Sequence, residues 1–163
     1  MHVRRTLLVA HPVERMYDLI EGAEYYPDFL PWCAAATILE RTEELVAARV
    51  TVEVRGVRFG FVTRNHQRRP EWMRLALSEG PFSRFDGEWQ LKPLGADGCR
   101  IDFTLDYDFE RAVMRTVAGA VFERITNTLV DAFVARADAL GDAIPRIVVA
   151  PLPTVPQDPG DPR

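Results

Sequence analysis

Hydrophobic and polar residues alternate along most of the chain between residues 35 and 109, and this pattern is typical of half-buried β-strands. A further β-rich run lies near the start of the chain, and a polar hairpin is expected at Asn65–Pro70. The strands expected from these patterns are residues 3–10, 35–41, 45–54, 57–61, 73–77, 85–92 and 99–109. Because five of these strands are joined by hairpin-length turns, we predict an antiparallel meander.

Helical spacing occurs in two other places. Residues 13–22 predict a helix after Pro12, and the prolines within residues 25–32 limit the next segment to one short helical turn. A long helix is expected from Arg111 to about Leu140, and at 1.5 Å per residue it would span roughly 45 Å. Its wide apolar face would have a central row of Val113, Val117, Val121, Ile125 and Leu129, with Met114, Ala118, Phe122, Ala132 and Phe133 in the neighbouring rows. Such a face must be covered, so we predict a two-layer α+β fold with the helix across the concave face of a curved sheet.

The composition indicates one domain with a tail. Of the 163 residues 47% are hydrophobic, and neither a membrane-length apolar run nor a signal peptide is evident. We therefore expect a cytoplasmic protein, with peripheral contact at the inner face of the membrane as a second location. The expected domain is residues 1–142. Residues 143–163 hold six of the twelve prolines, and we predict that this tail is disordered past about Val149.

Few residues could carry out catalysis. The three histidines are scattered, and Cys33 and Cys99 form no close-spaced pair, so the spacing supports neither a metal site nor a disulfide. Polar residues on the inward strand faces are expected to be nearly absent, with Tyr107 as the main candidate. A pocket without an acid, a base or a nucleophile is a poor active site. We expect no catalytic residue, no catalytic cofactor and no enzyme activity.

The predicted interior combines large and small residues. Gly60 and Gly87 lie beside aromatic residues in the strands, and Gly119 interrupts the long helix, where glycine costs about 1 kcal/mol relative to alanine. A bent sheet with small helix residues could leave a cavity for an apolar ligand, or could simply pack as a tight core. The pattern alone favours neither.

Three motifs resemble a known family. Residues 26–33, YPDFLPWC, are similar to the Y-P-x-F-L-P-W-C signature of the coenzyme-Q-binding START-like family. Residues 80–82 and 85–89, GPF and FDGEW, resemble its second signature, G-P-F and then L-x-G-x-W, with Phe85 in place of the usual leucine. Residues 103–109 resemble its last strand, F-x-L-x-Y-x-F. The similarity covers Met1 to about Leu140, and the bacterial members of the family include the RatA (ribosome association toxin) proteins.

The resemblance implies the helix-grip fold of the SRPBCC, START and birch-pollen-allergen superfamily. In that fold a seven-stranded curved antiparallel sheet wraps around a long C-terminal helix, two short helices lie between strands 1 and 2, and an apolar tunnel separates sheet and helix. Residues 1–142 would then form a START-like lipid-binding domain. The main function implied is non-catalytic binding of an isoprenoid quinone, such as ubiquinone, or of a similar lipid, in support of respiratory electron transfer.

Candidate ligand-binding residues follow from motif position and from strand alternation. By motif position, a flap over the tunnel would consist of Tyr26, Phe29, Leu30, Pro31 and Trp32, and Phe85 and Trp89 would belong to its wall. Alternation adds Val50, Val52, Phe59, Phe61, Leu75, Leu77, Phe103, Leu105 and Tyr107. The long helix adds Val117, Val121, Phe122 and Ile125. We expect its first half, residues 113–122, to be a tunnel wall and its second half, residues 125–133, to be ordinary core.

An alternative function involves the arginines. The RatA branch of the family is described as binding the large ribosomal subunit and blocking subunit association, which would make RNA the partner. The residues that could form a basic face of the sheet are Arg49, Arg58, Arg64, Arg68, Arg69 and Arg74. Against this, the net charge is −4, and cross-strand Arg–Glu pairing is the commoner use of such residues. No pattern points to DNA as a partner.

Overall fold

The computed structural model describes residues 1–149 and contains one antiparallel sheet. Its strands are β1 (His2–Val9), β2 (Cys33–Arg41), β3 (Leu45–Val54), β4 (Val57–Arg68), β5 (Trp72–Glu79), β6 (Phe82–Pro93) and β7 (Cys99–Phe109). Their order is β1-β7-β6-β5-β4-β3-β2, so β2 to β7 form the predicted meander and β1 adds to it beside β7. The predicted disorder past Val149 falls on residues outside the described range.

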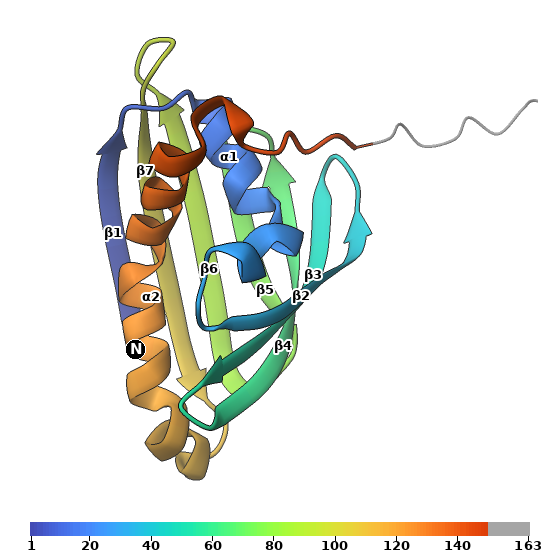
Figure 1. Cartoon of the computed structure of the whole chain (residues 1–163). Helices are drawn as coiled ribbons and strands as arrows, with labels where there is room; N and C mark the ends of the chain where they lie inside the picture. Colours follow the sequence, from blue (N-terminus) through green and yellow to red (C-terminus); the bar gives the residue numbers. More distant parts are fainter. Residues whose placement is uncertain (150–163) are drawn as a thin grey trace, which may run out of the picture.

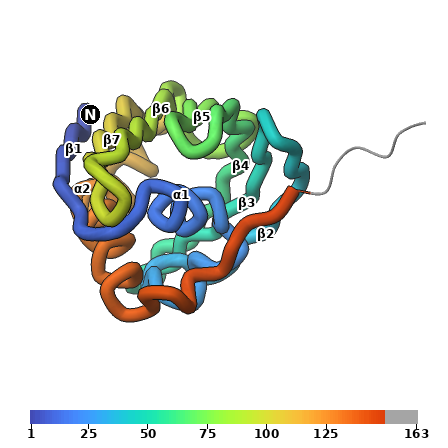
Figure 2. The backbone as a smooth tube through the Cα atoms, turned by 90° about the horizontal axis from the view of Figure 1, so that it is seen from above, coloured from blue at the N-terminus to red at the C-terminus, as the bar shows by residue number. Residues whose placement is uncertain are grey.

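Helices lie on the inner side of this sheet. Helix α1 (Val13–Glu21) and the 3-10 helix η1 (Ala23–Asp28) connect β1 to β2, and the long helix α2 (Ala112–Leu140) follows β7. Figure 1 shows α2 running along the strands, and Figure 2 shows the sheet as an arc with α1 inside it. The seven strands, the two short helices and the long C-terminal helix confirm the predicted helix-grip architecture. No helix within residues 1–149 is both long and apolar enough to cross a membrane.

The buried face of α2 includes Ala118, Phe122, Ile125 and Phe133 of the predicted face but not the start of its central row. Val113 and Val117 are 70% and 54% exposed, whereas the buried stripe consists of Ala118, Gly119, Phe122, Ile125, Thr126, Val130, Phe133 and Ala137. The predicted row advanced by four residues at each step, and each such step turns about 40° around a helix with 3.6 residues per turn. Over the twelve residues from Ile125 back to Val113 the row therefore turns by about 120° and leaves the sheet.

Strand β4 is longer than predicted, and the hairpin after it is shorter. The ladder between β4 and β5 continues to the pairs Gln67–Met73 and Arg68–Trp72, so the segment expected as a polar hairpin is mostly strand. As a consequence, Thr63, Asn65 and Gln67 lie buried on the inner face. The prediction that inward strand positions are nearly free of polar residues was therefore wrong. The polar residues of this segment suggested a turn, but Asn65 and Gln67 are polar side chains that a strand places in the interior.

The packed body continues beyond residue 142, where the domain was expected to end. A short 3-10 helix, η2 (Gly141–Ala143), follows α2, and Ile144 and Ile147 are then buried again. The Ile147 backbone N–H donates to Asp18 of α1 at 3.3 Å, and the Arg15 guanidinium donates to the Ile144 carbonyl at 3.0 Å. These contacts attach the segment after α2 to α1.

Candidate functional site: an interior cavity and an arginine-bearing outer face

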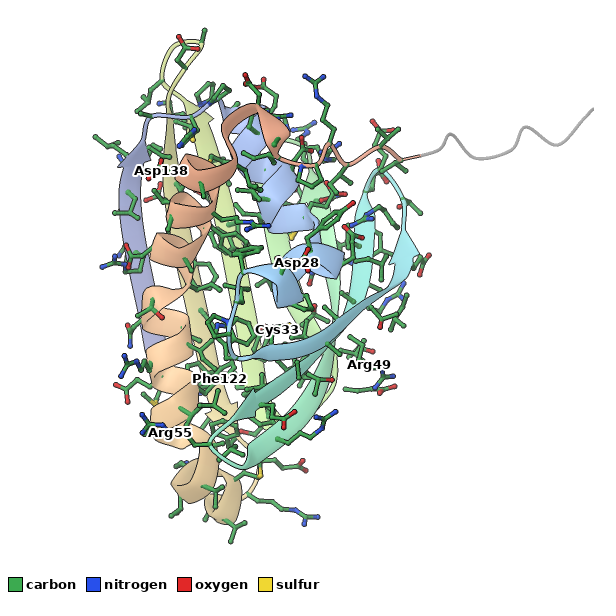
Figure 3. All side chains as sticks on the ribbon, in the orientation of Figure 1. Asp28, Cys33, Arg49, Arg55, Phe122 and Asp138 are labelled. Carbon is green, nitrogen blue, oxygen red and sulfur yellow. The ribbon has the colours of Figure 1, made fainter. Side chains whose placement is uncertain are left out.

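Phenylalanines fill the interior beside the first half of α2. Phe122 packs against Phe82, Phe59 and Phe109 with ring-centroid distances of 5.2, 6.0 and 6.0 Å, and Phe82 stacks on Phe109 at 4.9 Å. Tyr107 meets Phe122 edge-on at 4.8 Å. Figure 3 labels Phe122 between α2 and the sheet. Apart from Phe122, none of residues 113–122 lines the interior cavity described next, so the expectation that this half of α2 forms a tunnel wall was wrong.

A cavity of about 100 Å³ lies beside the second half of α2 instead. The predicted ligand-binding residues that line it are Tyr26, Trp32, Val50, Phe61, Leu75, Phe85, Trp89, Phe103, Leu105, Phe122 and Ile125. The predicted ones outside the lining are Phe29, Leu30, Pro31, Val52, Phe59, Leu77, Tyr107, Val117 and Val121. The lining residues that sequence reasoning missed are Ile20, Glu21, Ala23, Val46, Ala48, Thr63, Asn65, Met73, Thr126 and Leu129. Contact of any of them with a ligand stays a prediction.

Small side chains create this space. The inner face of β3 contributes Val46, Ala48 and Val50 to the lining, and η1 contributes Ala23. Beside the first half of α2, the inner faces of β4, β6 and β7 carry Phe59, Phe82 and Phe109 instead. The cavity therefore lies beside the part of β3 whose inward residues are small. Residues 125–133 of α2 were expected to be ordinary core, but Ile125, Thr126 and Leu129 belong to the cavity wall.

One end of the cavity is polar. Thr63 and Asn65 reach it from β4 and Glu21 from α1, and Thr126 of α2 adds a hydroxyl elsewhere in the lining. The Thr126 hydroxyl donates within its own helix, to the Phe122 carbonyl at 3.0 Å. Asn65 is only 7% exposed, and its Oδ1 has no hydrogen-bond partner among residues 1–149. Along the inner face of β4 the side chains thus change from aromatic at Phe61 to polar at Asn65.

A network of ion pairs closes the cavity behind this polar end. The Glu21 carboxylate, whose side chain is fully buried, lies 2.5 Å from Arg69 and 3.8 Å from Arg41, and it accepts from the Gln67 amide at 3.0 Å. Arg69 also contacts Asp18 at 2.5 Å. Burial raises the pKa of both carboxyl groups, against the opposing effect of the nearby arginines. The network fixes α1 on the inner face of β4.

The segment predicted as a flap is tightly packed. The Tyr26 hydroxyl donates to the Ile20 carbonyl, and the Tyr26 and Phe29 rings meet Phe133 of α2 edge-on at 5.4 and 5.5 Å. Arg41 of β2 holds the Glu24 carboxylate of η1 at 2.7 Å. These contacts join η1 to both α2 and the sheet.

Three lining residues indicate where the cavity approaches the surface. Trp32, Phe61 and Leu129 are partly exposed and belong to one apolar cluster with Leu30 and Val50. They come from the end of the flap, from β4 and from α2. A ligand larger than the cavity would have to separate these side chains.

The outer face of the sheet is charged. Figure 3 shows Arg49 on the outer side of the sheet, away from α2. The exposed ion pairs are Arg49–Glu79 at 3.6 Å, Arg58–Glu53, Arg64–Glu40 at 3.1 Å, Arg68–Glu71 at 3.6 Å and Arg74–Glu88 at 3.7 Å. The Arg74 guanidinium also lies 4.6 Å from the centre of the Trp72 ring. In this structure the arginines of the outer face thus pair with glutamates, which was the use weighed against RNA contact.

Arg69 does not belong to this outer face. It was predicted as an RNA contact on the assumption that it lies in an exposed hairpin, but its side chain is 26% exposed and is committed to Asp18 and Glu21. The other five predicted arginines have side chains that are 51–72% exposed. The next strands of the same sheet, β6 and β7, present carboxylates on the outer face, at Asp86, Asp102, Asp106 and Asp108. The outer face therefore has an arginine-rich half on β3–β5 and an acidic half on β6–β7.

Groups suited to metal binding are not assembled in residues 1–149, where no three His, Cys, Asp or Glu side chains are grouped to hold an ion. Cys33 and Cys99 are free and buried, and burial raises the pKa of each thiol to about 11. His2 and His11 each contact one surface aspartate, at 2.9 and 2.6 Å.

Comparison with known proteins identifies the family. Residues 9–134 match the family described as polyketide cyclase / dehydrase and lipid transport. The chain is 36% identical over 139 residues to the ribosome association toxin RatA of Pseudomonas aeruginosa, which covers 85% of this chain and 96% of that protein. It is 24% identical over 126 residues to a mitochondrial coenzyme Q-binding protein COQ10 homolog B of Xenopus laevis, covering 74% of this chain and 51% of that protein.

A solved structure shows the same fold. The START superfamily protein from Mycobacterium smegmatis superimposes with a TM-score of 0.68 at 23% identity, over 85% of this chain and 98% of that one. The resemblance drawn from the three motifs is confirmed by these matches. The chain belongs to the polyketide cyclase / dehydrase and lipid transport family.

Proposed function

We propose that this protein associates with the ribosome, binds the large subunit and blocks its joining to the small subunit. The observation that carries the proposal is the 36% identity, over nearly the whole length of the relative, to a protein named ribosome association toxin. The names of the similar relatives thus favour the alternative function over the lipid-binding one. Neither function requires catalysis, although the family description also includes cyclases and dehydrases.

The arginine-rich half of the outer face is the surface we propose for RNA contact. Exposed ion pairs such as Arg64–Glu40 and Arg74–Glu88 contribute only about 0–1 kcal/mol each, because water and salt screen them. Their arginines can therefore turn to RNA phosphates at little cost. The exposed Trp72–Arg74 stack adds a flat surface of the kind on which RNA bases stack. Phosphate contacts would make the affinity fall steeply with salt.

Co-sedimentation tests this function. The purified full-length chain is centrifuged with isolated large subunits, and separately with small subunits, at about 50 mM and about 200 mM salt, a range over which phosphate-dependent binding weakens strongly. We expect it to pellet with large subunits at low salt and to be released at high salt. If the protein stays in the supernatant at both concentrations, the proposal is refuted.

A second candidate function is binding of an apolar lipid, such as an isoprenoid quinone, in the interior cavity. The apolar lining, the words "lipid transport" in the family description and the distant relative named coenzyme Q-binding support it. The cavity of about 100 Å³ is smaller than the roughly 150 Å³ that hosts benzene in an engineered protein. Binding of a whole lipid therefore requires Trp32, Phe61 and Leu129 to move apart.

Two measurements test this second function. Lipids are extracted from the purified protein and identified, and ubiquinone is titrated while tryptophan fluorescence is recorded. Trp32 and Trp89 line the cavity, so ligand binding should quench their fluorescence. Trp72 lies on the outer face, and Trp72→Phe should leave the quenching unchanged because it removes only the fluorescence that the ligand does not affect. We expect Trp32→Ala to change the affinity, since its ring borders the proposed entrance. Absence of saturable quenching would contradict the function.

A further inference from the structure

We infer that Asn65 is the recognition site for the polar end of the cavity's ligand, and that this ligand is an apolar molecule ending in a neutral carbonyl or hydroxyl group. The inference rests on the second proposed function, ligand binding in the cavity, and specifies its chemistry. The Oδ1 atom of Asn65 accepts no hydrogen bond from residues 1–149.

Asn65 is more than nine-tenths buried and lines the cavity. Its cross-strand neighbours on the inner face are Val46 of β3 and Leu75 of β5, which offer no hydrogen bond. Among residues 1–149 no group binds its Oδ1. Buried polar side chains nearly always have a partner, since losing their hydration without compensation is costly. An amide directed into a cavity with an unused acceptor is therefore prepared for a group that comes from outside the chain.

Two neighbouring polar residues differ from Asn65 because they are hydrogen-bonded within the protein, and the lining carboxylate of Glu21 is paired with Arg69. Gln67, two positions along the same face, accepts from the Tyr17 hydroxyl at 3.0 Å and donates to Glu21 at 3.0 Å. Thr126, on the opposite wall, is satisfied by the Phe122 carbonyl. Both of these side chains are used to hold the structure. Along the inner face of β4, Asn65 lies between Gln67 of the ion-pair network and the apolar Phe61.

The charges behind Asn65 determine the kind of ligand. Arg69 and Arg41 are both engaged by carboxylates, at Asp18, Glu21 and Glu24. An anionic end group would find no unpaired cation at this depth among residues 1–149 and would lie near the buried Glu21 carboxyl. A neutral carbonyl or hydroxyl meets neither difficulty, because the asparagine amide can donate to one and accept from the other. The apolar lining then receives the rest of the molecule.

The test compares two probes of the same chain length: decylubiquinone, which has ring carbonyls, and decylbenzene, which has none. Their dissociation constants are measured from ligand-dependent thermal shifts of the full-length chain. For Asn65→Leu we expect decylubiquinone to bind about five- to tenfold more weakly, the effect of one hydrogen bond, and decylbenzene to bind within about twofold of wild type. Asn127→Leu, at an exposed asparagine of α2 outside the cavity lining, is the matched control, and both probes should bind it within about twofold of wild type.

The outcomes separate the inference from the function it rests on. If wild type binds neither probe, ligand binding in the cavity fails and the inference fails with it. If wild type binds decylubiquinone and Asn65→Leu binds it equally tightly, only the inference is overturned. Without ligand, Asn65→Leu should unfold at a temperature equal to or above that of wild type, because Asn65 has no partner to lose; a clear decrease would show a structural role and overturn the inference. Should Asn65→Leu fail to fold, Asn65→Ala replaces it with the same expected and contrary binding results.

Discussion

The inner and outer faces of the sheet use their polar residues in opposite ways. On the inner side, the buried Glu21 carboxylate contacts Arg69 at 2.5 Å and accepts from Gln67 at 3.0 Å, and this network fixes where α1 lies. On the outer face, arginines such as Arg64 and Arg74 form single, exposed pairs. Buried pairs cannot be exchanged without leaving a charge uncompensated, whereas exposed pairs can be replaced by another anion. The inner face therefore determines the fold and the cavity, and the outer face is available to a partner.

The largest effect should come from Phe122→Ala on the inner side. Phe122 is the centre of the aromatic cluster, and removing its ring should lower the free energy of unfolding by about 3–5 kcal/mol, because the surrounding rings cannot collapse into the space. Urea denaturation measures the change. A loss below about 1 kcal/mol would show that this end of the interior is not tightly packed.

Arg69→Met should have the next largest effect. Removing this guanidinium leaves the Asp18 and Glu21 carboxyl groups without their closest cation, and we expect a loss of about 3 kcal/mol. Adding Glu21→Gln to the same chain should restore part of that loss, since the uncompensated charge is then removed. Equal stability of Arg69→Met and wild type in urea would contradict a structural role for the network.

The pH dependence of stability offers a smaller but more specific test of the inner face. Burial raises the pKa of Glu21 above its ordinary value of 4.5. The folded state then holds a proton that the unfolded state has already released, so the stability contributed by Glu21 is full below about pH 4.5 and is lost as the pH rises through the folded pKa. Asp18, whose pKa is also raised by burial, contributes in the same direction.

Glu21→Gln isolates this contribution. The difference in unfolding free energy between wild type and Glu21→Gln, measured in urea from pH 4 to pH 8, should decrease as the pH rises. Contributions from Asp102 and Asp108, whose pKa values are lowered by neighbouring arginines and hydrogen bonds, occur in both proteins and cancel. A difference that increases with pH would show that the arginines outweigh burial at Glu21.

The smallest effects are expected at exposed positions. Val117→Ala, on the solvent side of α2, and Arg64→Ala, on the outer face, should each change the free energy of unfolding by less than about 0.5 kcal/mol. Urea unfolding of both variants, measured under the same conditions as Phe122→Ala, provides the comparison. A large loss for Val117→Ala would restore the predicted tunnel wall at the first half of α2.

Periodicity was sufficient to predict the fold, because alternation and helical spacing report directly which residues face the interior. It failed where a pattern had two interpretations. The valine row of α2 satisfies helical spacing but turns away from the sheet, and only the packed partner decides which of two neighbouring rows is buried. Likewise, the polar residues from Thr63 to Gln67 resemble a turn, and their burial depends on Tyr17 and Glu21, which are distant in sequence.

The candidate site was predictable only in part for the same reason. Aromatic lining residues such as Trp32 and Trp89 belong to motifs and alternating strands, so the sequence indicates them. The small lining residues Val46 and Ala48 give no distinct signal, because small apolar residues occur in any core. Arg69 could have been recognised as internal only from its proximity to α1, which strand patterns do not reveal.

The claim that the outer face binds the ribosome is tested most directly by charge reversal at two equally exposed arginines, one on each half of that face. Arg64 on the arginine-rich half and Arg100 on the acidic half have side chains that are 51% and 50% exposed, and each lies 3.1 Å from one carboxylate. In co-sedimentation with large subunits at low salt, we predict that Arg64→Glu is released while Arg100→Glu pellets like wild type. Equal pelleting of both variants, in the amount found for wild type, would contradict the assignment of this face.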